Sequence, residues 1–144
     1  MIRHRTLVPL SHDHHLGLVA AQRLKRGDAA YRDMSVADSI AELWKSELAT
    51  HFEQEERALF VLEVSSECRA MIERALADHA RMRELVAQAA RGDDPDATAR
   101  ELGALLEQHI GFEERELFEL MQTELGDGLD AIADRIPSRM SCRS

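Results

Sequence analysis

Two stretches of the chain repeat one another: HFEQEERALF at residues 51–60 and HIGFEERELF at residues 109–118. They are identical at six of ten positions, among them the histidine, two glutamates and the final phenylalanine. In each copy a glutamate follows a histidine by four residues, a spacing that places both side chains on one face of a helix. Two such pairs alone decide little, because glutamate is common in this chain. The shared residues around them indicate a duplicated structural unit.

Each copy lies at a similar depth in a long segment whose apolar residues recur with helical spacing. Four long helices are predicted, with Ser11 and Ser66 as N-caps of the first and third. The segment GDDPD at residues 92–96 predicts a turn before the fourth. The approximate predicted ranges are 11–25, 35–62, 66–91 and 96–124, followed by a short helix at 129–136. This pattern predicts an all-α fold: an up-down-up-down four-helix bundle with a short C-terminal helix.

The chain has 144 residues, so we expect a single domain over residues 1–144, with a flexible tail at 138–144. Its net charge of −9 disfavours binding to nucleic acid or to an anionic membrane. Two cysteines are too few for a disulfide framework or a cysteine-based metal site. No apolar segment has the length of a signal peptide or a transmembrane helix, which predicts a cytoplasmic protein.

The repeated motif places ionisable groups in the predicted core. His51 and Glu55, and likewise His109 and Glu113, lie on the core faces of their helices. An ionised carboxylate in a core is costly unless it is paired, hydrogen-bonded or bound to a metal ion. Two carboxylates that face each other across a bundle repel strongly, and divalent cations cancel their charge. The motif therefore predicts a buried metal site.

The other two long helices supply further histidines for such a site. His79 lies on the apolar face of the third helix. On the first helix His14 shares a face with Leu18 and Ala21 and is the preferred ligand, while His15 remains an alternative. Four histidines and two glutamates can hold two metal ions, with the carboxylates bridging them. Imidazole and carboxylate donors without a thiolate suit iron, manganese or zinc.

Two more glutamates directly follow the proposed glutamate ligands. Glu56 and Glu114 are each turned about 100° away from the ligand on an ideal helix. We expect them to be solvated or paired with the nearby Arg57 and Arg115.

These motifs resemble the hemerythrin-like, or HHE cation-binding, family. The resemblance covers nearly the whole chain: PLSHDHHLGL at residues 9–18, HFEQEERALF, DHARMREL at residues 78–85 and HIGFEERELF. It implies a four-helix bundle around a non-haem di-iron centre. The ligands it implies are one histidine of the first helix with His51, Glu55, His79, His109 and Glu113. Members of the family carry or sense oxygen, handle nitric oxide or peroxide, or take part in iron homeostasis and repair of iron centres.

The chain departs from the oxygen-carrying hemerythrins that it resembles in two ways. Their third helix has two histidines one turn apart, whereas Ala75 and Arg83 occupy the positions around His79 here. Their last carboxylate is an aspartate five residues after the histidine, whereas here it is Glu113, four residues after His109. Fewer imidazoles leave more coordination positions open. This argues against reversible oxygen carriage and makes redox chemistry at least as strong an expectation.

The leading hypothesis is a cytoplasmic di-iron protein that binds, senses or reduces oxygen, peroxide or nitric oxide. The alternative is a regulatory module that reports iron or redox state to a protein partner without turnover. A third hypothesis is a metal-free bundle with buried acid–imidazole pairs. The sequence identifies no acid–base residue outside the ligand set, and it therefore assigns no enzymatic activity.

Overall fold

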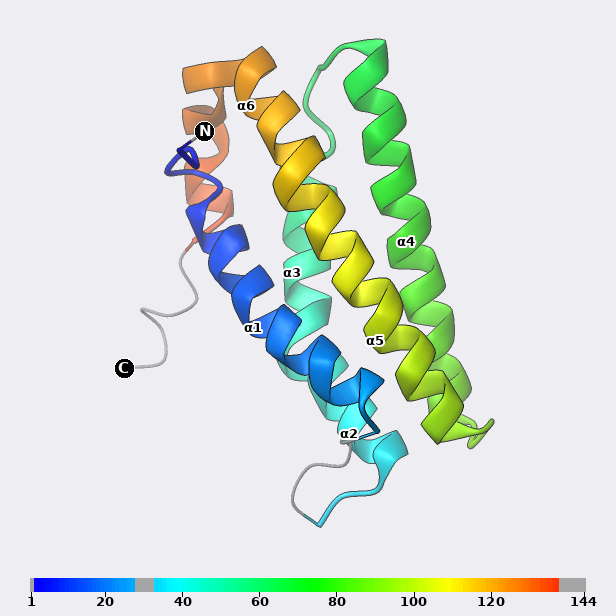
Figure 1. Cartoon of the computed structure of the whole chain (residues 1–144). Helices are drawn as coiled ribbons and strands as arrows, with labels where there is room; N and C mark the ends of the chain where they lie inside the picture. The colour runs from blue at the N-terminus through cyan, green and yellow to red at the C-terminus, as the bar shows by residue number, and fades with distance from the viewer. Residues whose placement is uncertain (1, 28–32, 138–144) are drawn as a thin grey trace.

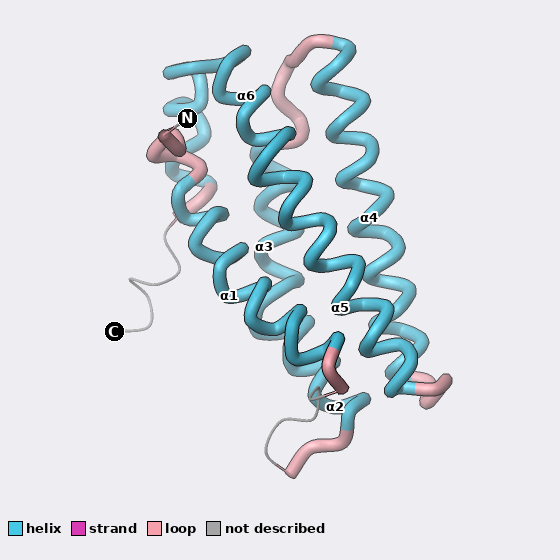
Figure 2. The backbone as a smooth tube through the Cα atoms, viewed as in Figure 1, coloured by secondary structure: helices cyan, strands magenta, loops and turns pink. Residues whose placement is uncertain are grey.

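The structure is a computed structural model that describes residues 2–27 and 33–137. Within these ranges the chain is helical and has no strand (Figure 2), so the predicted all-α class is confirmed. The predicted tail at 138–144 and most of the first connection lie outside the described residues. The elements are α1 (Val8–Lys25), α2 (Val36–Leu43), η1 (Trp44–Leu48), α3 (Ala49–Gln54), η2 (Glu55–Leu59), α4 (Ser66–Ala90), α5 (Pro95–Phe112), η3 (Glu113–Leu117), α6 (Phe118–Leu125) and η4 (Gly126–Arg135).

Within the described residues the elements form four long helical stretches, which lie side by side as in a helical bundle (Figure 1). The first is α1, the second runs from α2 to η2, the third is α4, and the fourth runs from α5 to α6. α5 packs along both α1 and α4, and α2 packs against α4. None of the helices in the described ranges is both long and apolar enough to cross a membrane.

Two of the predicted helix starts are wrong in detail. The predicted cap Ser11 lies inside α1, which begins at Val8 because Pro9, with its fixed φ, belongs to the first turn. The cap of α4 is Ser65 and not Ser66, since the Ser65 hydroxyl accepts a backbone N–H of the first turn at 3.1 Å. The short C-terminal helix is present as the 3₁₀ helix η4.

Three segments widen from α-helix to π-helix: η1, η2 and η3. η2 begins at Glu55 and η3 at Glu113, so the two copies of the repeat share this feature at the same position. The Glu55 carbonyl accepts the amide of Phe60, five residues on, at 2.8 Å, and the Glu113 carbonyl accepts the corresponding amide of Phe118. π-turns are rare and occur frequently at functional sites. The α-helical periodicity that predicts these helices does not predict their π-turns.

A layer of polar side chains divides the core into two apolar clusters. Along α4, Ile72 and Ala75 belong to one cluster, His79 follows, and Met82 and Leu85 belong to the other. The same order recurs along α1, and the reverse order along α5. The polar layer therefore lies across the middle of the bundle, with apolar packing on both sides that excludes water.

α1 and α5 approach one another closely at Gly103. A β-carbon at this position would lie 2.7 Å from the carbonyl oxygen of Ala21 and 2.9 Å from the backbone nitrogen of Lys25. Backbone atoms of a packed helix cannot move aside as a flexible side chain can. Glycine at 103 is therefore what permits the two helices to pack at this distance.

Candidate metal centre

Six of the seven predicted ligands converge in the polar layer. Their side chains come from all four helical stretches, and each residue is at most 3% exposed. They are His14 of α1, His51 of α3, Glu55 of η2, His79 of α4, His109 of α5 and Glu113 of η3. The seventh, His15, also lies on α1 but is exposed. Of the two candidates on this helix, the fold therefore directs His14 inward.

The six residues form two groups of four that share both glutamates. One group contains His14 and His51, and the other contains His79 and His109. We call them the α1–α3 half and the α4–α5 half of the centre. Within each half the potential ligand atoms all lie within 4.8 Å of one another. Glu55 and Glu113 are therefore common to both halves of the centre.

Each glutamate contacts one histidine of its own helical stretch and one from across the bundle. Glu113 Oε1 lies 3.4 Å from His109 Nε2 and 2.8 Å from His14 Nε2. For Glu55 the corresponding distances are 3.3 Å to His51 Nε2 and 3.1 Å to His79 Nε2. The two carboxylates therefore tie the halves together.

Several of these atoms have no hydrogen-bond partner among the described residues, although they lie close to one another. They are both carboxylate oxygens of Glu55 and of Glu113, and the Nε2 atoms of His79 and His109. Buried polar atoms are nearly always hydrogen-bonded, so a cluster of unpaired ones needs an explanation. A shared cation satisfies oxygen and nitrogen lone pairs that converge in this way. The donor set fits iron, manganese or zinc.

A carboxylate lies beside the outer nitrogen of every histidine in the centre. The Nδ1 contacts are His14 to Glu114 (2.7 Å), His51 to Asp13 (3.1 Å), His79 to Glu56 (2.7 Å) and His109 to Asp78 (3.0 Å). An Nδ1–H that donates to a carboxylate fixes the tautomer and leaves the Nε2 lone pair facing inward, as in most metal-binding histidines. The protein therefore orients all four imidazoles toward the shared space between them.

The structure corrects the expected roles of Glu56 and Glu114. The Glu56 carboxylate accepts hydrogen bonds from Arg83 at 2.9 and 3.0 Å, in addition to its contact with His79, and Glu114 accepts one from Arg3 at 3.3 Å. Each thus connects a buried histidine to a cation, and not to the arginine that follows it in the sequence. The turn of about 100° between neighbouring residues does not exclude this role. An imidazole is wide enough to meet one glutamate at Nε2 and the next at Nδ1.

The carboxylates also set the charge of the imidazoles. Burial, the largest single effect, lowers the pKa of His51, but the Glu55 carboxylate and the hydrogen bond to Asp13 outweigh it and raise this pKa to about 10. Burial opposes the charged form of His109 as well, and the nearby Glu113 carboxylate raises its pKa to about 10. His109 in turn brings the pKa of Glu113 well below its ordinary value, against the effect of burial. Without a metal ion the carboxylates thus favour protonated imidazoles, and a metal ion that binds at the Nε2 atoms displaces these protons.

Phenylalanine rings cover the histidines. Phe52 lies flat against His79, with ring centroids 4.0 Å apart and an angle of 13° between the planes. Phe118 stacks on His14 at 5.5 Å, and Phe60 lies 5.9 Å from His79. Because Phe60 and Phe118 are the last residues of the two repeat copies, the repeat supplies both ligands and cover. Apolar rings around the ligands limit the access of water.

Sequence reasoning missed the acidic partners, although the signal is present in the chain. Asp13 directly precedes His14 on the first helix, and Asp78 directly precedes His79 on the third. The first and third helices thus carry a second, shorter repeat. A search for duplicated Asp-His pairs, alongside the duplicated Glu-Glu pairs, identifies all four partners.

A family model described as "Hemerythrin HHE cation binding domain" matches residues 4–121. No curated protein and no solved structure is similar enough to the chain to count as a match. The matched range contains all six inward-facing residues and the four acids that contact the histidines. The predicted resemblance is confirmed, and the chain belongs to the hemerythrin HHE cation-binding domain family.

Proposed function

We propose that this protein is a non-haem di-iron protein that binds, senses or reduces oxygen, peroxide or nitric oxide. The observation that carries the proposal is the pair of four-residue groups that share Glu55 and Glu113. Two imidazoles and the two shared carboxylates would be available to each ion, and this donor set suits iron, with manganese or zinc as substitutes. We also propose the up-down-up-down order for the bundle, which the path of the chain in Figure 1 supports.

Iron held in this way supplies one-electron chemistry toward small ligands. The chain's own residues do the rest. The shared glutamates hold the two halves together, and the outer carboxylates keep every Nε2 atom directed inward. Phe52 and Phe118 limit the access of water. With four protein ligands, each ion would keep coordination positions for a small molecule.

Anaerobic loading with ferrous iron, followed by metal analysis and visible absorption, tests the proposal. We expect two iron ions per chain and a change in absorption on exposure to oxygen, peroxide or nitric oxide. Fewer than one ion per chain after loading rules out the di-iron centre. Full loading with negligible turnover, together with metal-dependent protease sensitivity, favours the regulatory alternative instead.

A matched pair of variants separates a loss of ligand from a general loss of stability. Glu113→Gln removes the charge of a shared carboxylate, so we expect less bound iron and a lower melting temperature. Glu116→Gln changes an exposed glutamate of the same π-turn, so we expect wild-type loading. Unchanged iron content in Glu113→Gln removes Glu113 from the ligand set.

A further inference from the structure

An arginine lies beside the repeated outer glutamate of each half of the centre. Arg83 of α4 donates two hydrogen bonds to Glu56, the carboxylate that contacts His79. The same position in the shorter repeat on α1 is occupied by Leu18, which cannot form such bonds. The α1–α3 half receives its arginine from elsewhere: Arg3, in the segment that precedes α1, donates to the corresponding glutamate.

This segment, residues 2–7, is a strap that is packed onto the end of the bundle. The Gln122 side chain of α6 holds two of its backbone groups. Gln122 Oε1 accepts the amide of His4 at 2.8 Å, and Gln122 Nε2 donates to the carbonyl of Ile2 at 3.1 Å. Leu7 at the other end of the strap is fully buried. The N-terminal end accordingly lies beside α6 in Figure 1, and the strap is a packed part of the fold.

Arg3 of the strap completes the π-turn η3. In this turn the amide of Phe118 bonds to the carbonyl of Glu113, so the carbonyl of Glu114 loses the donor that an α-helix would give it. Arg3 Nη2 donates to this carbonyl at 2.8 Å and to the Glu114 carboxylate at 3.3 Å. Arg3 Nη1 donates to Gln122 at 3.1 Å. One planar guanidinium with several donors thus joins the strap, the π-turn and α6.

Two contacts connect Arg3 to His14. The first is the Glu114 carboxylate, which lies 2.7 Å from His14 Nδ1 and is held by Arg3 from the strap and by the Ser11 hydroxyl from α1. The second is the ring of Phe118. It stacks on His14 with ring centroids 5.5 Å apart, and the guanidinium carbon of Arg3 lies 5.6 Å from its centroid. Arg3 therefore acts on the orientation of this imidazole through two neighbours.

We propose that Arg3 is a positioning residue for His14, and that the strap thereby controls how firmly the α1–α3 half of the centre retains its metal ion. The inference rests on the proposed function, since it names the residue that supports one of the two proposed ion sites. Arg3 lies one residue before the range that the family model matches, so this support is a feature of the chain outside that range. The α4–α5 half is supported by Arg83 from within the bundle, and we expect it to be independent of the strap.

Release of iron to an excess of a strong chelator tests the proposal, starting from the anaerobic protein loaded with ferrous iron. A changed partner of a metal-binding histidine weakens metal binding about 10- to 100-fold, and Arg3 acts one residue farther out. In Arg3→Gln one ion should therefore leave about tenfold faster, and the other at the wild-type rate. The inference is wrong if Arg3→Gln releases both ions no faster than the wild-type protein does.

Arg83→Gln is the matched change for the other half. It removes the same kind of side chain from the same kind of glutamate, so it should also accelerate the release of one ion. The double variant Arg3→Gln/Arg83→Gln should release both ions quickly, because each arginine supports a different half. If one ion stays slow in the double variant, the two arginines support the same half and the inference is wrong.

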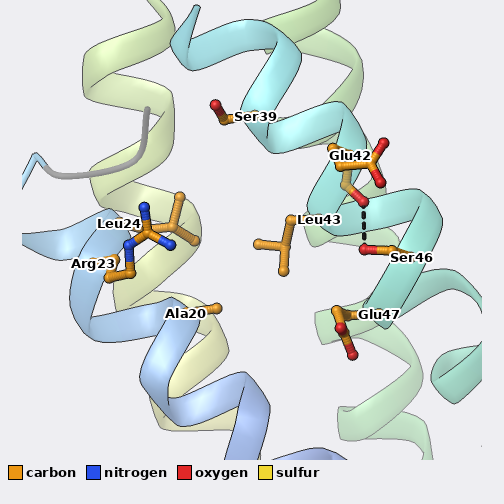
Figure 3. A pocket seen from close by; sticks show the side chains of 8 residues that line it. All are labelled: Ala20, Arg23, Leu24, Ser39, Glu42, Leu43, Ser46 and Glu47. Carbon is orange, nitrogen blue, oxygen red and sulfur yellow. Dashed lines mark hydrogen bonds between the residues drawn. The ribbon is translucent and has the colours of Figure 1, made fainter. Parts of the chain in front are cut away.

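Three further variants separate positioning from charge. Arg5→Gln removes a positive charge from the strap itself, where Arg5 pairs with Asp130 of η4 at 2.9 Å. Arg23→Gln removes one from α1, in the groove against α2 that Figure 3 shows, roughly 13 Å along the helix from His14. Both should release iron as the wild-type protein does. Arg3→Lys keeps the charge without the fork of donors and should lie between Arg3→Gln and wild type, whereas wild-type retention would show that charge alone suffices.

A second measurement needs no metal. Exchange of the imidazole Nδ1–H protons with water, followed by ¹⁵N NMR of the metal-free protein, reports whether each ring stays against its carboxylate. In Arg3→Gln the His14 proton should exchange several-fold faster, while the His79 proton exchanges as in the wild type. Unchanged exchange of the His14 proton overturns the inference and leaves the proposed function intact. Failure of the wild-type protein to hold iron defeats the proposed function instead, and the exchange rates still decide whether Arg3 positions His14.

Discussion

Each histidine of the centre lies with one nitrogen against a carboxylate and the other facing the shared space. The outer carboxylates therefore influence the metal site through the imidazoles, even though they do not belong to the two ligand groups. Glu56 illustrates this influence. It lies 2.7 Å from His79 Nδ1, and two hydrogen bonds from Arg83 hold it in place. A change at Glu56 should thus alter metal binding without removing a ligand.

Glu56→Gln should weaken iron binding about 10- to 100-fold, the usual effect of changing the partner of a metal-binding histidine. The glutamine oxygen still accepts the His79 Nδ1–H, but the negative charge that strengthens the imidazole as a donor is lost. Competition with a chelator of known affinity measures the effect. Glu53→Gln is the control, because Glu53 lies on the same helical stretch and forms an ion pair with the exposed Arg57. Equal iron affinity in both variants would show that Glu56 does not support His79.

Cys68 should be unreactive in the native protein at neutral pH. Burial is the largest effect on this thiol, and with the nearby Glu124 it raises the pKa to about 11. An unfolded cysteine has a pKa of about 8.5. Because the unfolded chain loses this proton first, the stability linked to the neutral thiol is complete below about pH 8.5 and is lost as the pH rises toward 11.

The rate of alkylation by iodoacetamide between pH 7 and 11 checks this prediction, in a Cys142→Ser background so that only one thiol reacts. We expect the native protein to react slowly at pH 8 and the urea-unfolded protein to react rapidly at the same pH. A native titration midpoint near that of the unfolded chain contradicts the assignment of a buried, neutral thiol.

The sequence predicts the inward residues better than their partners, for a physical reason. Helical periodicity indicates which face of a helix a residue occupies. This is enough to predict that His79 and the two His-Glu pairs point into the core. It leaves His14 and His15 as alternatives, since adjacent residues both border the apolar face of α1. Only the packed fold places His14 inside and His15 outside. The role of Glu56 depends on its contacts with His79 and Arg83 of another helix. Periodicity does not describe contacts between helices.

At the scale of elements, the helices depart from α-helical geometry at the two shared glutamates of the centre. η2 and η3 both begin at a shared glutamate, in segments that read EERAL and EEREL. Nothing in these residues' helix propensities disfavours an ordinary α-helix, because glutamate, arginine, alanine and leucine are all good helix formers. The widening therefore follows from tertiary packing around the centre, which is why the sequence predicts the helices and not their π-turns.

Gly103→Ala should destabilise the bundle even though alanine favours helix by about 1 kcal/mol. The methyl group would press on the backbone of α1 at Ala21 and Lys25, and such overpacking costs about 1–3 kcal/mol. Urea unfolding measures the loss. Gly111→Ala serves for comparison, since its β-carbon would meet only the Arg115 side chain, which is exposed and can turn away. If both variants are equally stable, α1 and α5 do not depend on Gly103 for their close packing.

At the scale of the whole molecule, the buried polar layer makes the fold less stable than a continuous apolar core would. The two apolar clusters would form one continuous core if apolar residues replaced the six polar ones. Buried charges are a poor source of stability unless their partners are complete. The sequence anticipates this layer because both repeat copies place ionisable residues on apolar helix faces.

The protein should accordingly be much more stable with iron than without it. An ion present at 100 times its dissociation constant stabilises the folded state by about 2.7 kcal/mol, which for a chain of this size raises the melting temperature by on the order of 5–10 °C. Thermal unfolding of the loaded protein, before and after treatment with a strong chelator, measures the difference. The double variant Glu55→Gln/Glu113→Gln, which lacks both shared carboxylates, should melt at one temperature whether or not iron is added. A wild-type protein that has been loaded with iron and then melts unchanged after chelation would instead be a bundle whose acid–imidazole pairs are stable without metal.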